Sequence, residues 1–383
     1  MDDKTILNTE MLPIGTILHD TYRIDSYLAS GGFGKTYVAT NLQFNEKVAI
    51  KEFFLKDVSY RGGDGMTVSI STSGGRSTFD SQLKKFKVEA QRLRKLDNRH
   101  IVKVHDLFDA NDTSYYVMDF IDGESLSARL KRLHHPLTVV ETENIFKQVL
   151  DALNATQNAN PPLLHLDINP RNIMIDKQGK VTLIDFGASK QLDPEGGATA
   201  FSAVAMSKHY APLEQMEGNP KKFGPWTDFY ALGATMYNLL ANAVPPLPTD
   251  IAEDNTPDKH LILPFPTAVP RKVRSIVLWL MQTNRTERPQ SVSEIISRLN
   301  NIETDATEVD TVELEKLQRA KAESETKRKA TEEAREKTEA ETRKKSERSG
   351  RGGELLQREK QYRKMMARCP QPMPIIIPIK QYA

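Results

Sequence analysis

The chain has 383 residues, a formal net charge of +2 at pH 7 and a single cysteine, Cys369. This length allows a catalytic domain near the upper end of single-domain size, together with an appendage. The small net charge gives no reason to expect binding to nucleic acid or to a membrane surface. One cysteine excludes an internal disulfide framework and a multi-cysteine zinc site, and it suits a reducing compartment.

Neither a signal peptide nor a membrane span is predicted. The first residues, Met1 to Lys4, include two aspartates, and no long apolar run follows them. No stretch approaches the roughly 20 apolar residues that a membrane-spanning helix needs. We therefore expect a cytoplasmic protein.

Strand patterns dominate the first part of the chain, after a polar lead over residues 1–16. A glycine-rich turn separates the first two predicted strands, and the Gly- and Ser-rich residues 57–78 predict a long excursion from the sheet. One helix is predicted after it, from the helical spacing of its apolar residues. The predicted strands are Tyr22–Ala29, Tyr37–Asn41, Lys47–Phe54, Ile101–Phe108 and Ser114–Phe120, and the helix is Phe79–Leu96.

Helical patterns dominate after Gly123. The first predicted helix has Thr138 at its start and an apolar face that includes Ile145 and Leu153. Strands first and helices later predict an α+β protein with two lobes and a cleft between them. The predicted helices are Thr138–Ala159, Asp228–Ala241, Lys272–Thr283 and Val292–Leu299.

The composition changes beyond Ile302. Residues 303–349 are built mainly from Glu, Lys, Arg, Ala and Thr, with i,i+4 pairs such as Glu323 and Lys327 in the favourable order. Large apolar residues are nearly absent, which favours a solvated single helix; a coiled coil, whose seam needs better a and d residues, is the alternative. Residues 350–383 form an irregular tail unlike the rest of the chain, and a truncated or out-of-frame end is one interpretation of it.

The stretch His165–Asn172 carries the strongest chemical signal. Asp167 and Asn172 stand five residues apart, and two short apolar segments joined by a turn lead to the motif Asp185–Gly187. If these segments pair as strands, Asp167, Asn172 and Asp185 meet at one mouth. That set suits phosphoryl transfer, with one carboxylate to orient a hydroxyl and two oxygen ligands for magnesium. A turn-forming Asp and a helix-capping Asn are the structural alternative, which leaves the second aspartate motif unexplained.

Two further motifs are weak when taken alone. The glycine-rich turn lets the backbone approach phosphates without a Cβ clash, but glycine-rich hairpins are common in any sheet. Lys51, in the strand Val48-Ala49-Ile50-Lys51, needs an anionic partner if its side chain points inward, and Glu89 on the next helix is the candidate. A single lysine on a strand is more often simply exposed.

Together these motifs resemble a protein kinase, specifically a bacterial eukaryotic-like Ser/Thr kinase, over about Ile17 to Ile302. The order glycine loop, Val-Ala-Ile-Lys, helix Glu, catalytic Asp and Asn, and Asp-Phe-Gly matches the kinase signature set. The match continues in residues 210–214, which resemble the end of the activation segment. Residues 226–233 resemble the buried helix that anchors the catalytic loop, and Arg288 resembles the late arginine that pairs with the Glu214 position.

The resemblance implies an α+β, bilobal protein-kinase-like fold. Its N-lobe, residues 17–121, would be a small antiparallel sheet with one helix, and its C-lobe, residues 122–302, would be mostly helical. The charged helix of residues 303–349 and the tail of residues 350–383 would follow.

The resemblance also implies a site for ATP. Gly31 and Gly34 would cover the phosphates, Met118 would be the gatekeeper, and the backbone from Asp119 to Ile121 would bind adenine. The implied nucleotide-binding residues are Leu28, Ala29, Ser30, Gly31, Gly32, Phe33, Gly34, Thr36, Ala49, Lys51, Met118, Asp119 and Ile121.

The implied catalytic residues are Asp167, Lys51, Glu89 and Asn169. Lys51, held by Glu89, would contact the α- and β-phosphates, and Asp167 would orient the substrate hydroxyl and accept its proton. The implied metal ligands are Asn172 and Asp185, for Mg²⁺ with Mn²⁺ as an alternative. His165 is expected to be structural, and structural roles also fall to Glu214, Asp228 and Arg288.

Four departures from the kinase pattern qualify these expectations. Ala29 replaces the first loop glycine, and Thr36 replaces the valine that packs on adenine. Leu166 replaces the arginine that pairs with an activation-segment phosphate, so strict phosphate control is not expected. Asn169 replaces a lysine near the γ-phosphate, which is expected to slow the reaction rather than abolish it.

We therefore expect a Ser/Thr protein kinase that uses Mg·ATP and acts on a protein substrate. Ser207 stands where Ser/Thr kinases carry a threonine near the substrate hydroxyl, and autophosphorylation at Thr199 or Ser202 is a hypothesis. The alternatives are a pseudokinase scaffold, supported by Ala29 and Asn169, and a small-molecule phosphotransferase of kinase-like fold. The charged helix is a candidate for self-association or partner binding.

Overall fold

The computed structural model describes residues 10–32, 34–71, 73–191, 207–254, 263–302, 361 and 363–364. The chain divides into two compact units, residues 1–307 and residues 308–383. The predicted charged helix of residues 303–349 and nearly all of the tail lie outside the described residues, as do Phe33, Thr199 and Ser202. Within the described ranges, no helix is both long enough and apolar enough to cross a membrane.

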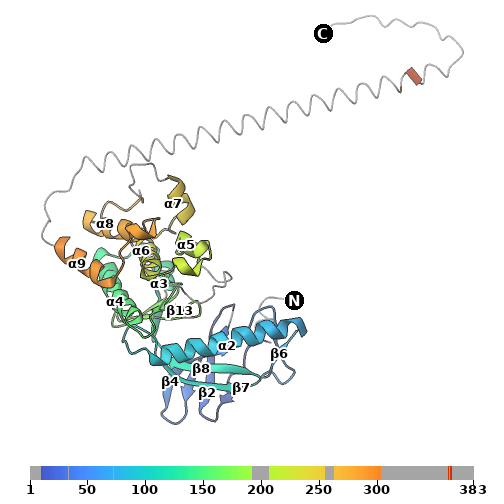
Figure 1. Ribbon diagram of the computed structural model, residues 1–383. Helices are drawn as coiled ribbons and strands as arrows, with labels where there is room; N and C mark the ends of the chain where they lie inside the picture. The colour runs from blue at the N-terminus through green and yellow to red at the C-terminus, as the bar shows by residue number, and fades with distance from the viewer. Residues whose placement is uncertain are drawn as a thin grey trace, which may run out of the picture. The chain divides into compact units, whose positions relative to one another are not determined.

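The first lobe contains a six-stranded antiparallel sheet in the order β1-β2-β3-β4-β8-β7. Figure 1 shows this sheet with the long helix α2 beside it. All five predicted strands are present, with ends shifted by a few residues. β2 and β3 flank the glycine-rich turn, and β4 carries Lys51. The strands are β1 (Ile17–Leu18), β2 (Tyr22–Ser30), β3 (Gly34–Asn41), β4 (Glu46–Phe53), β7 (Val104–Ala110) and β8 (Thr113–Asp119).

The predicted excursion of residues 57–78 is more ordered than expected. It contains a hairpin of β5 (Ser59–Arg61) and β6 (Val68–Ile70), and α2 (Ser73–Lys95) begins at Ser73 rather than at Phe79. Glycines are poor helix formers, which is why the start of α2 was predicted as loop. Its first turns are held by packing, because the Phe79 ring lies 5.0 Å from the Phe53 ring on β4.

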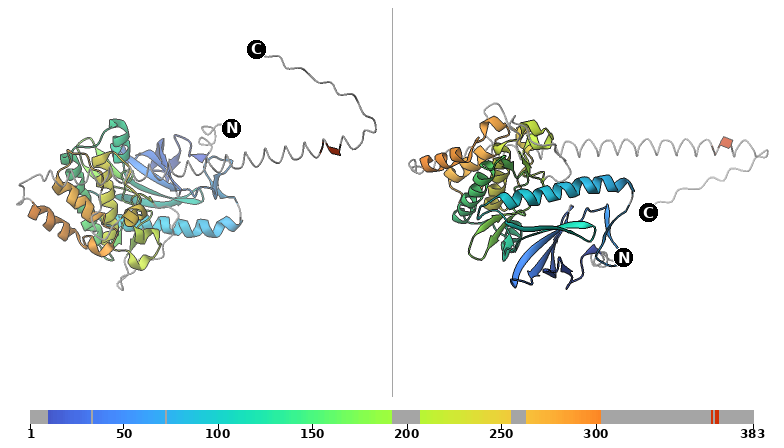
Figure 2. Two further views of the ribbon diagram at one scale, coloured as in Figure 1. Left: turned by 90° about the horizontal axis from the view of Figure 1, so that it is seen from above. Right: turned by 60° about the horizontal axis from the view of Figure 1, so that its bottom comes forward.

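The two faces of this sheet have separate cores. On one face lies α2 (Figure 2), whose Phe79, Phe86 and Leu93 repeat every seven residues and are buried. On the other face a smaller apolar cluster includes Tyr37, Ile50 and Tyr115, and Leu12 from the N-terminal segment closes it. Alternation along β4 therefore sends Ile50 to one face and Lys51 to the other.

The second lobe is helical. Its helices are α3 (Leu126–Leu133), α4 (Val139–Gln157), α5 (Leu213–Met216), α6 (Pro225–Ala241), α7 (Pro248–Asp254), α8 (Arg271–Leu280) and α9 (Val292–Ile302). The four predicted helices correspond to α4, α6, α8 and α9. The short helices α3, α5 and α7 were not predicted, because each offers too few turns for a clear period.

α6 is the central helix of this lobe. Every residue from Thr227 to Leu240 is buried, so the helix is covered on all sides. It packs closely on α8 at Gly233, where a Cβ would lie 2.7 Å from the Cβ of Leu280. Only glycine permits that approach. The first turn of α6 carries Asp228, whose carboxylate accepts hydrogen bonds from the backbone of residues 165 and 166.

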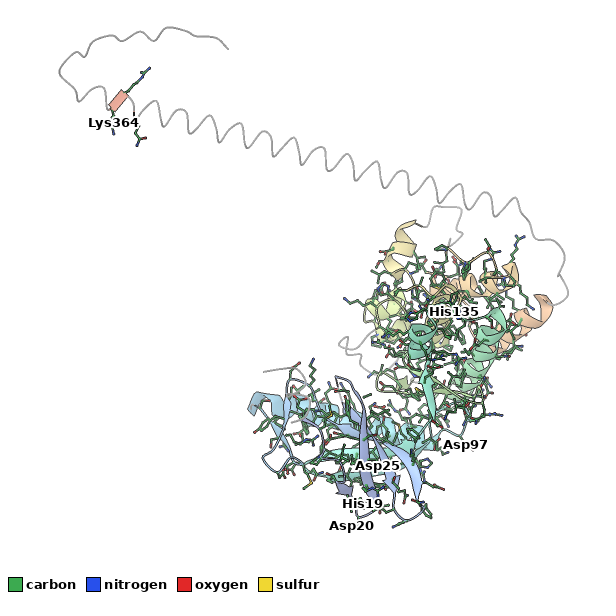
Figure 3. The ribbon with its side chains drawn as sticks, turned by 180° about the vertical axis from the view of Figure 1, so that it is seen from behind. His19, Asp20, Asp25, Asp97, His135 and Lys364 are labelled. Carbon is green, nitrogen blue, oxygen red and sulfur yellow. The ribbon has the colours of Figure 1, made fainter. Side chains whose placement is uncertain are left out.

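A small three-stranded sheet joins the lobes at the site. The predicted strand pair is present as β11 (Ile173–Asp176) and β12 (Val181–Leu183), and β9 (Gly123–Ser125) adds to its edge. The turn between β11 and β12 has Gly179 at a φ of 82°, a conformation that favours glycine. Figure 3 shows Asp25 in the sheet lobe, His135 in the helical lobe and Asp97 in the segment that follows α2.

Candidate active site

The glycine-rich turn joins β2 to β3 and lies against β4. The N–H of Gly31 donates to the carbonyl of Gly34 over 2.9 Å, and Leu28, Ala29 and Ser30 on its rising strand are exposed. A Cβ at Gly34 would lie 2.6 Å from the Glu52 carbonyl oxygen on β4. The turn therefore depends on glycine at this position to lie against the strand that carries Lys51.

Lys51 lies between two carboxylates. Its Nζ is 3.3 Å from Glu89 Oε1 on α2 and 2.9 Å from Asp185 Oδ1. The Tyr116 hydroxyl donates to the same Glu89 oxygen over 3.0 Å. The predicted ion pair of Lys51 with Glu89 is thus present, and it brings β4, α2 and the Asp185 motif together at one point.

The charges of Lys51, Glu89 and Asp185 shift one another's pKa values. Burial alone would lower the pKa of Lys51, but the negative charges of Asp185 and Glu89 raise it well above its ordinary value. Burial raises the pKa of Glu89, and the charge of Lys51 opposes that rise. The pKa of Asp185 is lowered, chiefly by the charge of Lys51. Lys51 is therefore a permanent cation in the cleft, suited to an anionic ligand.

The connection between the lobes follows β8. Ala49 on β4 is buried directly opposite Met118 in the antiparallel register, and both are predicted adenine-pocket residues. Asp119 ends the strand, and its N–H donates to the Lys103 carbonyl over 3.1 Å. Ile121 follows, half-buried, before β9.

Asp167 is the centre of the hydrogen bonds in the catalytic loop. The Asn172 amide nitrogen donates to its Oδ2 over 2.7 Å and to its backbone carbonyl over 2.8 Å. The Asn169 amide nitrogen donates to Oδ1 over 3.1 Å, and the Ser207 hydroxyl donates to Oδ1 over 2.7 Å. Burial raises the pKa of Asp167, and the bond from Ser207 partly offsets that rise.

Side chains of α6 and α5 hydrogen-bond to the backbone of the catalytic loop. Leu166 has a φ of 63°, a left-handed conformation that is rare for a bulky side chain. The N–H groups of His165 and Leu166 donate to the two carboxylate oxygens of Asp228, each over 2.8 Å, and Gln215 donates to the Leu166 carbonyl over 2.6 Å. These bonds offset the strain and set the direction of Asp167.

His165 supports the loop from within the core. It is fully buried, its Nε2 lies 3.1 Å from the Ile184 carbonyl, and its ring lies 4.4 Å from the Phe186 ring. Burial lowers its pKa from 6.5 to about 4. A neutral imidazole fixed in this way is structural, as predicted.

Leu166 occupies a small apolar cluster with Leu164 and Phe223, and Ala188 packs against it. The side chain that replaces the family's phosphate-pairing arginine is thus buried in hydrocarbon. Residues 210–214 are held separately by a buried ion pair, in which Nη1 and Nη2 of Arg288 donate to the two carboxylate oxygens of Glu214 over 2.7 and 3.1 Å. That pair is the one expected from the sequence.

Two residues of this site were not singled out from the sequence. Arg171, in the catalytic loop, donates from Nη2 to the Ser207 hydroxyl over 3.0 Å, so it adds a cation beside Asp167 and Asn169. An exposed arginine in a loop has no sequence signal of its own. The replacement of the usual lysine by Asn169 is the one observation that could have directed attention to a nearby cation. Gln215 lies on a four-residue helix that the sequence pattern does not reveal.

The residues present fit a magnesium–nucleotide complex. The amide nitrogen of Asn172 is used by Asp167, so its amide oxygen is the atom available to a metal, and Asp185 offers a half-exposed carboxylate. Among the described residues no group of three or more His, Cys, Asp or Glu could hold a metal. Two protein ligands with phosphate oxygens are the arrangement that Mg²⁺ favours in nucleotide sites.

Comparison with known proteins shows that the chain is similar to bacterial serine/threonine-protein kinases. Serine/threonine-protein kinase PrkC of Bacillus subtilis is 30% identical over 277 residues, which are 69% of this chain and 38% of that protein. A probable serine/threonine-protein kinase PknB of Corynebacterium glutamicum is 28% identical over 307 residues, 76% of this chain and 43% of that protein. The chain thus spans about two fifths of the length of these relatives.

The fold and the family agree. A solved structure described as the apo form of PpkA-294 superposes with a TM-score of 0.63 at 22% identity, covering 76% of this chain and 99% of that one, which confirms the predicted bilobal fold. The family model for the protein kinase domain matches residues 22–298. The chain therefore belongs to the protein kinase domain family.

Proposed function

We propose that this chain is a protein kinase that transfers the γ-phosphoryl group of Mg·ATP to Ser or Thr hydroxyls of proteins. The observation that carries the proposal is that two groups of residues meet. Lys51 is paired with Glu89 and Asp185, Asn172 is bonded to Asp167, and a backbone hydrogen bond of 2.9 Å from Ile184 to Asn172 joins the two groups. The names of the relatives support Ser and Thr as acceptors.

The chain's own residues supply positioning and charge. Lys51 is a cation that holds the α- and β-phosphates, and the glycine turn covers them with N–H groups. Asp167 accepts a hydrogen bond from the acceptor hydroxyl. It takes the proton as the new oxygen–phosphorus bond forms and the bond to the β-phosphate oxygen breaks, leaving ADP. Its raised pKa suits that role.

Magnesium, when bound with ATP, would neutralise charge on the phosphate oxygens. Asn172 and Asp185 are the residues that would hold it. The other residues that we propose to contact the nucleotide are Leu28 to Ser30, Thr36, Ala49, Met118 and the backbone of Asp119 to Ile121. Phe33 is also proposed, and it lies outside the described residues.

The experiment measures the transfer of radioactive phosphate from labelled ATP, and it compares the full wild-type chain with its Asp167→Ala variant. Casein and small-molecule hydroxyl compounds serve as acceptors, with Mg²⁺ or Mn²⁺. We expect label on Ser and Thr of the protein acceptor and a loss on the order of 10²- to 10⁴-fold in the variant. Asp97→Ala is the matched control, because that carboxylate is 98% exposed, is paired with Lys103 and lies in the segment that follows α2 (Figure 3).

Three outcomes separate the candidate functions. Label on the protein acceptor that depends on Asp167 supports the proposal. Label only on small molecules would support a small-molecule phosphotransferase, and wild-type transfer no greater than that of Asp167→Ala with either metal would support a pseudokinase. Mass spectrometry after incubation with ATP, searching residues 188–208, tests autophosphorylation at Thr199 or Ser202.

A further inference from the structure

A buried ionic cluster lies on the outer face of the N-lobe sheet, behind the catalytic lysine. Glu52 follows Lys51 on β4, so alternation along the strand sends its side chain away from the cleft. Glu52 is fully buried, with an exposed fraction of 0%. A buried carboxylate in an otherwise apolar core is costly unless it is paired and fully hydrogen-bonded.

Four donor groups from three residues satisfy Glu52, and Arg61 of the inserted hairpin supplies two of them. Arg61, the last residue of β5, places one guanidinium nitrogen 2.7 Å from each carboxylate oxygen, and its side chain is 2% exposed. The hydroxyls of Tyr37 and Tyr115 each donate to one oxygen over 2.8 Å. This bidentate arrangement fixes both the position and the rotation of the carboxylate.

The same arginine ties down the N-terminal segment. Arg61 donates to the Glu10 carbonyl from Nε and Nη2, over 3.2 and 2.9 Å. Lys35, next to Gly34 on β3, donates to that carbonyl over 2.6 Å and to the Glu10 carboxylate over 3.0 Å. Both cations lie over the Phe54 ring. The hairpin and the N-terminal segment are thereby fastened to β3 and β4.

This anchor lies directly beside the nucleotide-binding parts of the sheet. In the β3–β4 register Lys35 is opposite Glu52, and Thr36 is opposite Lys51. The Glu52 carbonyl is also the surface on which Gly34 rests, because a Cβ at Gly34 would approach it to 2.6 Å. A movement of the Glu52 backbone would therefore displace the glycine turn and Lys51 together.

We propose that Arg61 is a positioning residue for nucleotide binding, which acts through Glu52 to hold the glycine turn and Lys51 at their working separation. The inference rests on the proposed kinase function. Lys51 is fixed on the cleft side by Glu89 and Asp185, and the Arg61 cluster fixes the same strand from the opposite face. Replacing a buried ion pair with an apolar pair of similar volume is often neutral or stabilising. The role we assign to the Arg61–Glu52 pair is therefore to select one arrangement of the sheet, not to add stability.

The experiment measures the dissociation constant of a fluorescent ATP analogue with Mg²⁺, and KM and kcat for ATP and for a protein acceptor, on the full chain. For Arg61→Gln we expect both the dissociation constant and the KM for ATP to rise on the order of tenfold, because the glycine turn and Lys51 are no longer held together. The KM for the protein acceptor should stay within about twofold. Arg61→Lys keeps the positive charge but cannot bind both carboxylate oxygens as the guanidinium does. Its dissociation constant and KM for ATP should lie between those of the wild type and Arg61→Gln.

Two further variants separate positioning from folding. Arg61→Gln combined with Glu52→Gln leaves no uncompensated buried charge, so it tests the position if Arg61→Gln alone fails to fold; we expect its nucleotide affinity to be lowered as well. Lys87→Gln breaks an ion pair of 2.7 Å with Asp109 in the same lobe, where Asp109 is 65% exposed, and should change nothing. Thermal melting confirms that each variant is folded at the assay temperature.

The proposal is overturned if folded Arg61 variants bind the analogue within about twofold of the wild type. It is overturned equally if they lose kcat only in proportion to their folded fraction. Wild-type protein that binds the analogue but transfers no phosphate would refute the kinase function, and the analogue titration would still decide the role of Arg61.

Discussion

The Ser207 hydroxyl donates a hydrogen bond of 2.7 Å to Asp167 Oδ1, across 40 positions of the chain. The same oxygen of Ser207 accepts from Asn169 at 3.3 Å and from Arg171 at 3.0 Å. Ser207 therefore links the end of the activation segment to the carboxylate that is expected to orient the substrate. Together with Asn169 and Asn172, Ser207 is one of three side chains in the described part of the chain that donate to the Asp167 carboxylate.

Replacing Ser207 is expected to reduce turnover. Ser207→Ala removes a hydrogen bond to a charged group, worth about 1.5–3 kcal/mol, so kcat should fall roughly ten- to hundredfold. Ser207→Thr keeps the hydroxyl and should stay close to the wild type. Steady-state kinetics with a protein acceptor measure both. Ser275→Ala, which removes a hydroxyl that donates to the Lys272 carbonyl within α8, is the matched control. Full activity in Ser207→Ala would contradict the assigned link.

Arg171 is expected to supply the cation that Asn169 cannot. Removing its charge in Arg171→Gln should lower kcat by roughly tenfold or more, with a smaller change in the KM for ATP, because the charge acts on the developing phosphoryl group. Adding Asn169→Lys to that variant returns a cation to the loop and should recover much of the loss. Arg76→Gln, which breaks an exposed pair with Asp80, controls for total charge. Equal kcat in Arg171→Gln and wild type would contradict this role.

His165 is expected to make stability depend on pH. Burial lowers its pKa to about 4 in the folded chain, against an ordinary 6.5, so the unfolded chain binds more protons between these values. The stability that His165 contributes is present above pH 6.5 and is lost as the pH falls towards 4, up to about 3 kcal/mol. Urea unfolding, followed by fluorescence of Trp226 and Trp279, measures it.

The comparison that isolates this effect is between the wild type and His165→Gln. The variant should lose less free energy of unfolding between about pH 7 and pH 4.5, because its side chain does not titrate. His135→Gln, on an exposed ring, should keep the wild-type dependence. Parallel losses in all three proteins would show that His165 is not the source.

The sequence was most informative where chemistry restricts the choice of residue. The spacing of Asp167, Asn172 and Asp185 predicted a strand pair that brings them together, and β11 and β12 are present. Lys51 was assigned Glu89 as a partner because a lysine in a cleft needs an anion, and the pair is present. The roles of these residues in ATP and metal binding stay predictions.

Other features depend on packing that has no local pattern. Arg61 lies in a Gly- and Ser-rich stretch that predicts loop, and only the fold shows that its side chain is buried on Glu52. The first turns of α2 contain Gly74 and Gly75, so propensity argues against the helix that Phe79 holds in place. Ser207 was predicted to lie near the acceptor hydroxyl, but its bond to Asp167 required coordinates.

The burial of Leu166 affects how the catalytic loop can be controlled. The N–H of Leu166 donates to Asp228, and its carbonyl accepts from Gln215. Its side chain lies in an apolar cluster with Phe223. An anion brought against that side chain would meet hydrocarbon and would gain no ion pair. We therefore expect no phosphate to act through the Leu166 position, and we expect a signal that adjusts the rate to act on the binding of nucleotide or acceptor instead.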